Sequence, residues 1–261
     1  MMVKDEADII GPVLSHWLAQ DIDYLLVSDN LSTDGTSEIL GASFLAAPRL
    51  KVVRDPVVAY YQSQKMTGLA HMMGEIGCDW IIPADADELW FVEGSTVGSY
   101  LRTVSRETKI LQVDLWNHYP TKWDDSTILN PFLRIQHRHM DLGKLPKVCF
   151  RYAPDCRIMQ GNHDVRFETA NGAPIKSPLA IRHFPYRSEQ QFIRKCRNGA
   201  EAYRQAKDVP EYEGAHWRQY GRILENQGEA GLSYFFYDWF YFQESRRGEL
   251  VLDPAPYRGI Q

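Results

Sequence analysis

Three carboxylates stand close together at the end of an apolar stretch. Residues 80–84 are mostly apolar, which predicts a short buried strand, and Asp85, Asp87 and Glu88 follow at once. In open α/β sheets, ligands bind at the carboxyl ends of strands. Carboxylate oxygens suit Mg²⁺ and Mn²⁺, which keep coordination positions open for substrate phosphates. The spacing predicts a site for a metal and a diphosphate, although an acidic solvated loop has the same composition.

Other charged residues could complete such a site. Asp29 ends a second apolar stretch, at 24–28, and could hydrogen-bond a base or ribose, or simply close an Asx turn. Lys4 and Lys65 could reach a phosphate and Glu6 a ribose. Exposed charges on a solvated surface would produce the same pattern.

Later residues offer a metal ligand and a base. His183 is the candidate metal ligand, because it follows a short apolar stretch and precedes a capped helix. Asp164 is the candidate general base, since a carboxylate within hydrogen-bond reach can take the proton of an acceptor hydroxyl. Glu168 and Asp114 are alternatives that the sequence leaves open. His163 lies beside Asp164 in a glycine-led turn, and the sequence assigns it no role.

The elements that must position these residues alternate along the chain. Strands are predicted at 24–28, 50–53 and 80–84, and helices over 5–19, around 38–40 and over 62–76. This alternation predicts an α/β fold with a mainly parallel sheet flanked by helices. The apolar start at residues 1–3 is very short for a first strand, so most of that strand would be missing. A capped helix is predicted from Ser188.

Composition narrows the class of protein. The chain has 261 residues, of which 44% are hydrophobic, enough for a sizeable core, and its net charge of −5 implies no general affinity for nucleic acid. The four cysteines form no CxxC pair, which argues against zinc and favours a reducing compartment. No apolar run is long enough to span a membrane, which predicts an intracellular protein. The aromatic segment 234–242 is expected to pack against the domain, or to contact an acceptor or a membrane surface.

Several familiar motifs are absent from the sequence. There is no GxGxxG and no GxxxxGK[ST], so dinucleotide binding and a P-loop are disfavoured. There is also no GxSxG and no HExxH, which argues against a hydrolase with a nucleophile elbow and a zinc protease.

The ordered set of polar motifs resembles family 2 glycosyltransferases of the GT-A fold. The segments that carry the resemblance are 3–10, 28–36 and 85–88, followed by 161–164 and 182–188. The last two resemble a bacterial subgroup with an RHFPYRS-like signature. The similarity spans roughly residues 3–200, and the Asp-x-Asp pair alone is a weak motif. The resemblance implies a GT-A domain over 1–200, with a nucleotide-binding half (1–90) and an acceptor-side half (91–200), and a helical, aromatic-rich C-terminal extension (201–261).

The resemblance also implies roles for single residues. Asp29 would bind the nucleotide base, Asp85 the ribose or the metal, and Asp87 the metal, with His183 as a late metal ligand. Asp164 would be the base of an inverting transfer. The implied cofactor is Mn²⁺ or Mg²⁺, and the implied donor is a UDP-, GDP- or TDP-sugar. The acceptor would be a glycan or a lipid-linked hydroxyl in the cytoplasm or at the inner face of the membrane.

Two other functions remain open at this point. A nucleotidyltransferase also uses a strand-end Asp-x-Asp pair with a metal, but it would want a glycine-rich or basic phosphate loop near the first strand, and none is seen. A non-catalytic protein that binds nucleotides or sugars is the other alternative. The intact Asp85, Asp87 and His183 argue against it.

Overall fold

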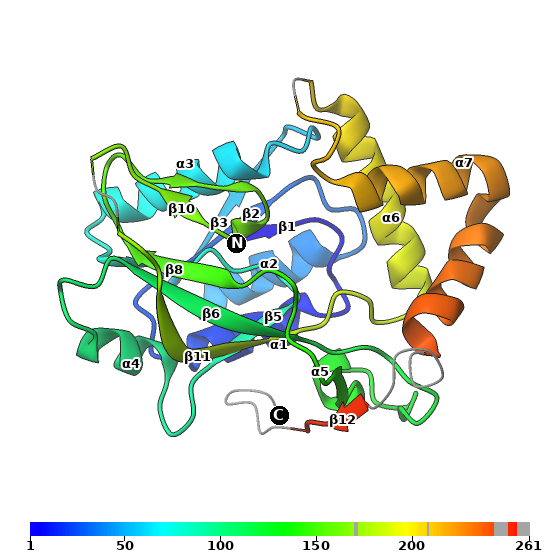
Figure 1. Cartoon of the computed structure of the whole chain (residues 1–261), viewed down its shortest axis with the longest axis horizontal. Coiled ribbons are helices and arrows are strands. Elements are labelled where there is room, and N and C mark those ends of the chain that lie inside the picture. The colour runs from blue at the N-terminus through cyan, green and yellow to red at the C-terminus, as the bar shows by residue number, and fades with distance from the viewer. Residues whose placement is uncertain (170–171, 208, 243–249, 255–261) are drawn as a thin grey trace.

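A short parallel sheet forms the first half of the fold (Figure 1). The computed structural model describes residues 1–169, 172–207, 209–242 and 250–254. Strands β1 (Met2–Val3), β2 (Leu25–Asp29) and β3 (Leu50–Arg54) pair in parallel in the order β1-β2-β3. All residues of β2 are buried, as its apolar start at residues 25–27 predicts, and the burial extends to the polar Ser28 and Asp29 at its end.

A second sheet of five strands follows, in the order β4-β8-β6-β11-β5. Its strands are β4 (Trp80–Ile81), β5 (Glu88–Phe91), β6 (Ile110–Asn117), β8 (Lys147–Arg151) and β11 (Ile175–His183). Only β6 and β11 are parallel neighbours, and the other pairs are antiparallel. The fold is therefore mixed α/β, and the predicted parallel arrangement applies to the first sheet.

The larger helices cover the sheets. They are α1 (Ile10–Leu18), α2 (Thr36–Ala46), α3 (Gln62–Glu75), α4 (Val97–Thr103), α6 (Glu189–Gln205) and α7 (Ala215–Phe236). The short elements are α5 (Pro131–Arg134), β7 (His137–His139), β9 (Arg157–Ile158), η1 (Gln160–Asn162), β10 (Val165–Arg166), η2 (Tyr237–Tyr241) and β12 (Leu250–Leu252). Ser188 caps α6 by accepting a hydrogen bond from the Gln191 amide, which confirms the predicted start of that helix.

The helix predicted over 5–19 begins only at Ile10. Asp5 has a φ of 54°, outside the helical region, and its carboxylate accepts a hydrogen bond from the backbone amide of Thr33. The Glu6 amide donates to the hydroxyl of Thr36. Residues 5–8 therefore form a loop that is folded against the start of α2, and this tertiary contact overrides the local helical pattern.

One apolar core joins the two sheets through α1. Trp17 of α1 lies against Trp90 of β5, with ring centroids 6.2 Å apart. The same cluster includes Val27 of β2, Leu115 of β6 and Ile181 of β11, all buried. The loops that leave β1, β2 and β4 are thereby fixed relative to β11, which ends at the predicted metal ligand.

Helices α6 and α7 stand to one side of the sheets (Figure 1). A separate aromatic cluster holds them together, with Phe192 of α6 against Tyr220 and Phe236 of α7 and against Phe240 of η2. The aromatic segment therefore packs on the protein through these rings, whereas Tyr234 remains 72% exposed.

The predicted extension over 201–261 is only partly described. Residues 208, 243–249 and 255–261 of it lie outside the described residues. In the part of the chain that the structure covers, no helix combines the length and the apolar character that crossing a membrane requires.

Gly98 marks a close approach of two backbones. A Cβ atom at this position would lie 1.9 Å from the carbonyl oxygen of Asp21, and the Gly98 amide donates to the carbonyl of Gln20. We expect Gly98→Ala to lower the free energy of unfolding by about 1–3 kcal/mol, because α4 must move away. Urea denaturation measures this change.

Gly68→Ala is the matched control for that measurement. Gly68 lies in α3 with no atom within 4 Å of an added Cβ, so alanine should leave stability equal or raise it by up to about 1 kcal/mol. Equal stability of the two variants would contradict the close approach at α4.

Candidate active site

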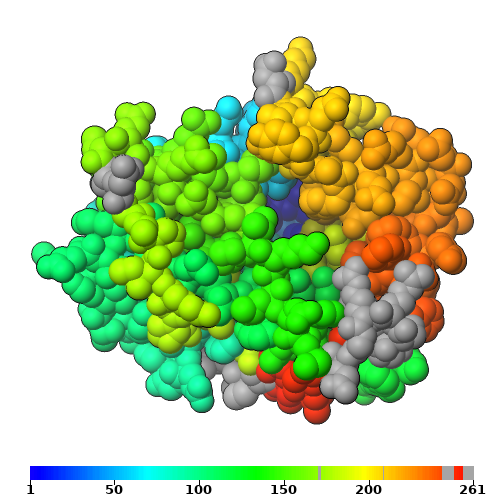
Figure 2. Space-filling model, viewed as in Figure 1, coloured from blue at the N-terminus to red at the C-terminus, as the bar shows by residue number. Residues whose placement is uncertain are grey.

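A cavity of about 580 Å³ opens between the sheets and the C-terminal helices. Figure 2 shows the hollow between the green strands and the orange α7, with blue N-terminal residues at its floor. Its charged lining residues are Lys4, Glu6, Lys65, Asp85, Asp87, Lys144, Lys147 and Lys195. The loops after β1 and β2 contribute Lys4 and Asn30, so the cavity lies at the carboxyl ends of the parallel strands.

Asp85 is held by two side chains from the second half of the chain. Its Oδ2 lies 2.5 Å from Nζ of Lys147, and its Oδ1 accepts a hydrogen bond from Nδ2 of Asn162 at 2.9 Å. The Lys147 ammonium also lies 2.9 Å from Oε1 of Glu88 and donates to the carbonyl of Gly161. Burial acts to lower the pKa of Lys147, but Asp85 and Glu88 raise it above its ordinary value, so the ammonium stays charged.

Glu88 has a structural position beneath the site. It belongs to β5 and is fully buried, and its Oε2 accepts hydrogen bonds from the backbone amide of Asp85 and the indole of Trp90. Burial raises the pKa of Glu88 even though Lys147 opposes that shift. These contacts fix the turn that carries Asp85 and Asp87.

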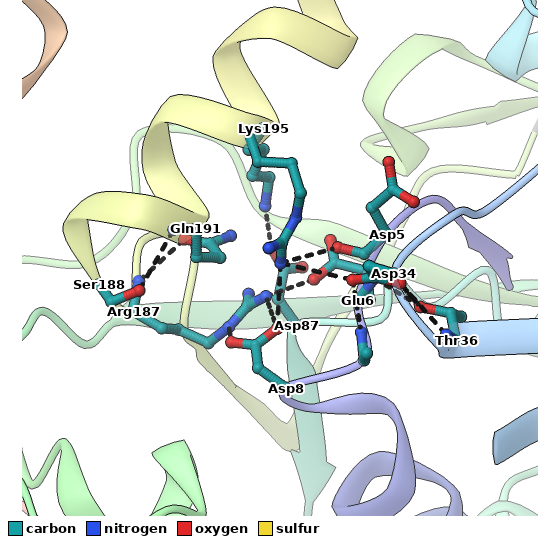
Figure 3. Close-up of polar contacts among 12 residues, drawn as sticks. Asp5, Glu6, Asp8, Asp34, Thr36, Asp87, Arg187, Ser188, Gln191 and Lys195 are labelled. Atoms are coloured by element: carbon teal, nitrogen blue, oxygen red, sulfur yellow. Dashed lines mark hydrogen bonds and ion pairs between the residues drawn. The ribbon is translucent and has the colours of Figure 1, made fainter. Parts of the chain in front are cut away.

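Asp87 uses its two oxygens differently. Oδ2 accepts a hydrogen bond from Nζ of Lys195 at 2.5 Å, and Oδ1 lies 3.6 Å from Nε2 of His183 (Figure 3 shows the lysine reaching the acid from α6). Burial acts to raise the pKa of Asp87, but Lys195 and His183 hold it well below the ordinary value. The carboxylate is therefore ionised at neutral pH.

The donor atoms between Asp87 and His183 suit a divalent metal. Nδ1 of His183 lies 2.8 Å from Oδ1 of Asn117, which can only accept, so Nδ1 carries a proton and Nε2 is the ring nitrogen that could bind a metal beside Asp87. Two adjacent ligands on a metal at about 2.1 Å lie about 3 Å apart, so the 3.6 Å separation needs only a small adjustment.

The number of protein ligands determines how such a metal would be coordinated. Among the described residues, no group of three His, Cys, Asp or Glu side chains could hold a metal ion. Two protein ligands leave the other positions to phosphates and water, which is how Mg²⁺ is usually held beside a substrate. The residues present therefore fit a metal that shares its coordination with a bound diphosphate.

A buried arginine connects the first loop to α6. Arg187 is 1% exposed, and its guanidinium forms ion pairs with Glu6 and with both oxygens of Asp8, at 2.7 and 2.8 Å (Figure 3). Burial raises the pKa of Glu6 more than Arg187 lowers it. Burial also acts to raise the pKa of Asp8. The hydrogen bonds and the charge of Arg187 outweigh burial there and keep the pKa of Asp8 below its ordinary value.

The sequence of the first half matches a known family. Residues 1–159, more than half of the chain, match the family model described as Glycosyl transferase family 2. The chain belongs to glycosyl transferase family 2. Among solved structures, it is similar to the mannosyltransferase PcManGT from Pyrobaculum calidifontis in complex with GDP-Man and Mn2+, with 14% identity and a TM-score of 0.36 over 95% of this chain and 74% of that one. A search of curated proteins gave no match.

In this glycosyl transferase, six of the eight predicted site residues line the cavity. These are Lys4, Glu6, Lys65, Asp85, Asp87 and His183. Glu6 lies there with its carboxylate on Arg187, and Lys65 forms an ion pair with Asp55 at 2.5 Å. Their assignment to ribose and diphosphate remains a prediction.

The other two predicted residues lie outside the cavity lining. Oδ1 of Asp29 accepts a hydrogen bond from the Ser32 amide, and its Oδ2 accepts one from the Ser37 hydroxyl. The first bond closes the loop three residues on, one residue further than an Asx turn does. The adjacent Asn30 faces the cavity instead. Asp164 directs Oδ1 to the backbone amide of Val165 at 2.8 Å.

Sequence reasoning named Lys4 and Lys65 but missed three other cations of the glycosyl transferase site. Lys147, Arg187 and Lys195 all pair with carboxylates that lie far away along the chain. Lys147 stands in an ordinary strand sequence that carries no signal. Arg187 stands in the signature segment 182–188, which carried a resemblance but no assigned role, and the only signal for Lys195 was its place in the helix that starts at the Ser188 cap.

The buried ion pairs of Arg187 predict a large effect on stability. We expect Arg187→Met to lower the free energy of unfolding by roughly 3–5 kcal/mol, because Glu6 and Asp8 would lose their shared partner. Urea denaturation followed by circular dichroism measures the loss.

Arg197→Met is the control on the same helix. Arg197 pairs with Glu229 at the surface, with both side chains more than half exposed, so its replacement should cost less than about 1 kcal/mol. If the two variants were equally stable, Arg187 would not be the anchor of the first loop.

Proposed function

We propose that this glycosyl transferase moves a sugar from a nucleotide-sugar donor to an acceptor hydroxyl, with inversion at the anomeric carbon. The observation that supports this most is a cavity that brings the donor atoms of Asp87 and His183 together with lysine ammonium groups. Lys65, Lys147 and Lys195 are already paired with carboxylates. Lys4 and Lys144 also line the cavity and form no ion pair among the described residues. Lysine is a common phosphate ligand, so these two can meet the negative charge of a diphosphate. A UDP-, GDP- or TDP-sugar carries such a diphosphate.

The metal would be held by Asp87 and His183. When bound, Mn²⁺ or Mg²⁺ would neutralise charge on the leaving nucleoside diphosphate. Lys195 contacts the other oxygen of Asp87, so it can remain in place and keep that carboxylate ionised. The Asn117 amide keeps His183 in the tautomer that offers Nε2.

The donor side of the cavity is assigned to the predicted nucleotide-sugar residues. Asp85, positioned by Lys147, would face the ribose, and Lys65 would approach the diphosphate. Glu6 would contact the ribose from the floor of the cavity, where its ion pair with Arg187 holds it in place. Asp29 is assigned to the wall that binds the base. Its carboxylate holds the turn after β2, and that turn places Asn30 in the cavity lining.

The acceptor side is assigned to the wall formed with the C-terminal helices. Tyr60, Tyr203 and Trp217 line the cavity there and offer apolar ring faces. Aromatic rings with a few polar neighbours are typical of sites for small organic ligands. A glycan or a lipid-linked hydroxyl in the cytoplasm, including its membrane surface, is the proposed acceptor.

A donor panel separates this function from its alternatives. The protein would be incubated with UDP-, GDP- and TDP-sugars and with Mn²⁺ or Mg²⁺, and the released nucleotide measured. We expect metal-dependent release of a nucleoside diphosphate from one donor class. A nucleotidyltransferase would instead form or cleave the bond at the α-phosphate, and a non-catalytic protein would bind a donor without turnover. Either result, or no binding at all, would contradict the proposal.

Asp87→Asn tests the assigned metal ligand. We expect kcat to fall by about 10²–10³-fold, because charge on the leaving diphosphate would lose its stabilisation. Metal-dependent nucleotide binding, measured by calorimetry, should weaken in parallel. Asp23→Asn is the control, since that side chain is 79% exposed and lies outside the cavity lining. If nucleotide binding by Asp87→Asn depended on the metal as it does in the wild type, Asp87 would not be a metal ligand.

A further inference from the structure

A turn with unusual backbone angles carries His163 to the cavity wall. Gly161 and Asn162 in η1 have φ values of 76° and 60°, so two successive residues adopt the left-handed conformation. Such a conformation costs energy for a residue other than glycine and persists only where neighbours fix it. Here the fully buried Asn162 donates to Asp85. The turn is therefore tied to the acid pair of the active site.

Gly161 makes the space that the His163 ring occupies. A Cβ atom on Gly161 would lie 2.5 Å from Cδ2 and 2.8 Å from Nε2 of the ring. The turn is also held from two sides, because the Gly161 amide donates to Gln62 and its carbonyl accepts from Lys147. The imidazole thus has a defined position rather than a free surface rotamer.

The hydrogen bond of the His163 ring fixes its tautomer. Nδ1 lies 2.8 Å from the carbonyl oxygen of Pro146, which can only accept, so Nδ1 carries the proton. His163 lines the cavity, and among the described residues none hydrogen-bonds its Nε2. Burial lowers the pKa of His163, and the charge of Lys147 lowers it further. A neutral ring with a free Nε2 lone pair is what a general base requires.

We propose that His163 is the general base that deprotonates the acceptor. This inference rests on the proposed function of the cavity. The acceptor O–H bond breaks and its proton goes to Nε2 of His163, while the oxygen forms a bond to the anomeric carbon. The bond from that carbon to the diphosphate oxygen breaks, and the nucleoside diphosphate leaves with the electron pair.

Asp164 is the rival for this role. Its Oδ1 is engaged with the adjacent backbone amide of Val165, and it is not among the cavity-lining residues. His163 and Asp164 are neighbours in the chain, but only the imidazole faces the site. Asp164 helps to shape the turn that leads into β10, through the bond of its carboxylate to the Val165 amide and through its backbone carbonyl, which accepts a hydrogen bond from the Met159 amide.

The test compares variants at His163 in the full-length protein. His163→Asn can keep the hydrogen bond to the Pro146 carbonyl while removing Nε2, and His163→Ala opens space for added imidazole. Nucleotide release would be measured with the donor found in the panel, with water and with a set of methyl glycosides as acceptors. Donor binding would be measured by calorimetry, and Arg166→Gln would be the exposed control in the same hairpin.

We expect both His163 variants to bind the donor like the wild type, with kcat lower by about 10²–10⁴-fold. Imidazole should restore part of the rate in His163→Ala, which a purely structural role would not produce. A wild-type rate in His163→Asn, or no effect of imidazole, would overturn the assignment, as would a loss confined to Asp164→Asn. A wild-type protein that turns over no donor overturns the proposed function itself.

Discussion

The arrangement of the site depends on the burial of one guanidinium. An isolated charge in the interior costs several kcal/mol, so Arg187 can lie there only because Glu6 and Asp8 face it. These acids belong to the loop after β1, whereas Arg187 immediately precedes the cap of α6. The ion pairs therefore fix the first loop against the helix that presents Lys195 to Asp87.

The two acids of the Asp-x-Asp pair have separate surroundings. Asp85 contacts Lys147 and Asn162, whereas Asp87 contacts Lys195 and lies near His183. Each carboxylate thus has its own cation, Lys147 for Asp85 and Lys195 for Asp87. This division leaves Oδ1 of Asp87 facing a histidine nitrogen.

Local patterns predicted the acids but not their partners. Asp85, Asp87 and His183 could be found because each follows an apolar stretch that ends in a strand or a turn. Lys147 and Lys195 could not, since only the paired sheet and the position of α6 bring them to these acids. The helix predicted from residue 5 failed for the same reason, because long-range contacts of the first loop delay its start to Ile10.

The separation of Glu6 and Arg187 along the chain also bears on synthesis. The contact joins residues 181 positions apart. At roughly 5–20 residues per second, a ribosome needs about 10–40 s between them. During that time β1 to β3 emerge with Glu6 and Asp8 hydrated rather than buried, so the nascent chain exposes an unfinished acidic loop. The cavity, whose lining reaches Trp217, can form only after these later residues have been made.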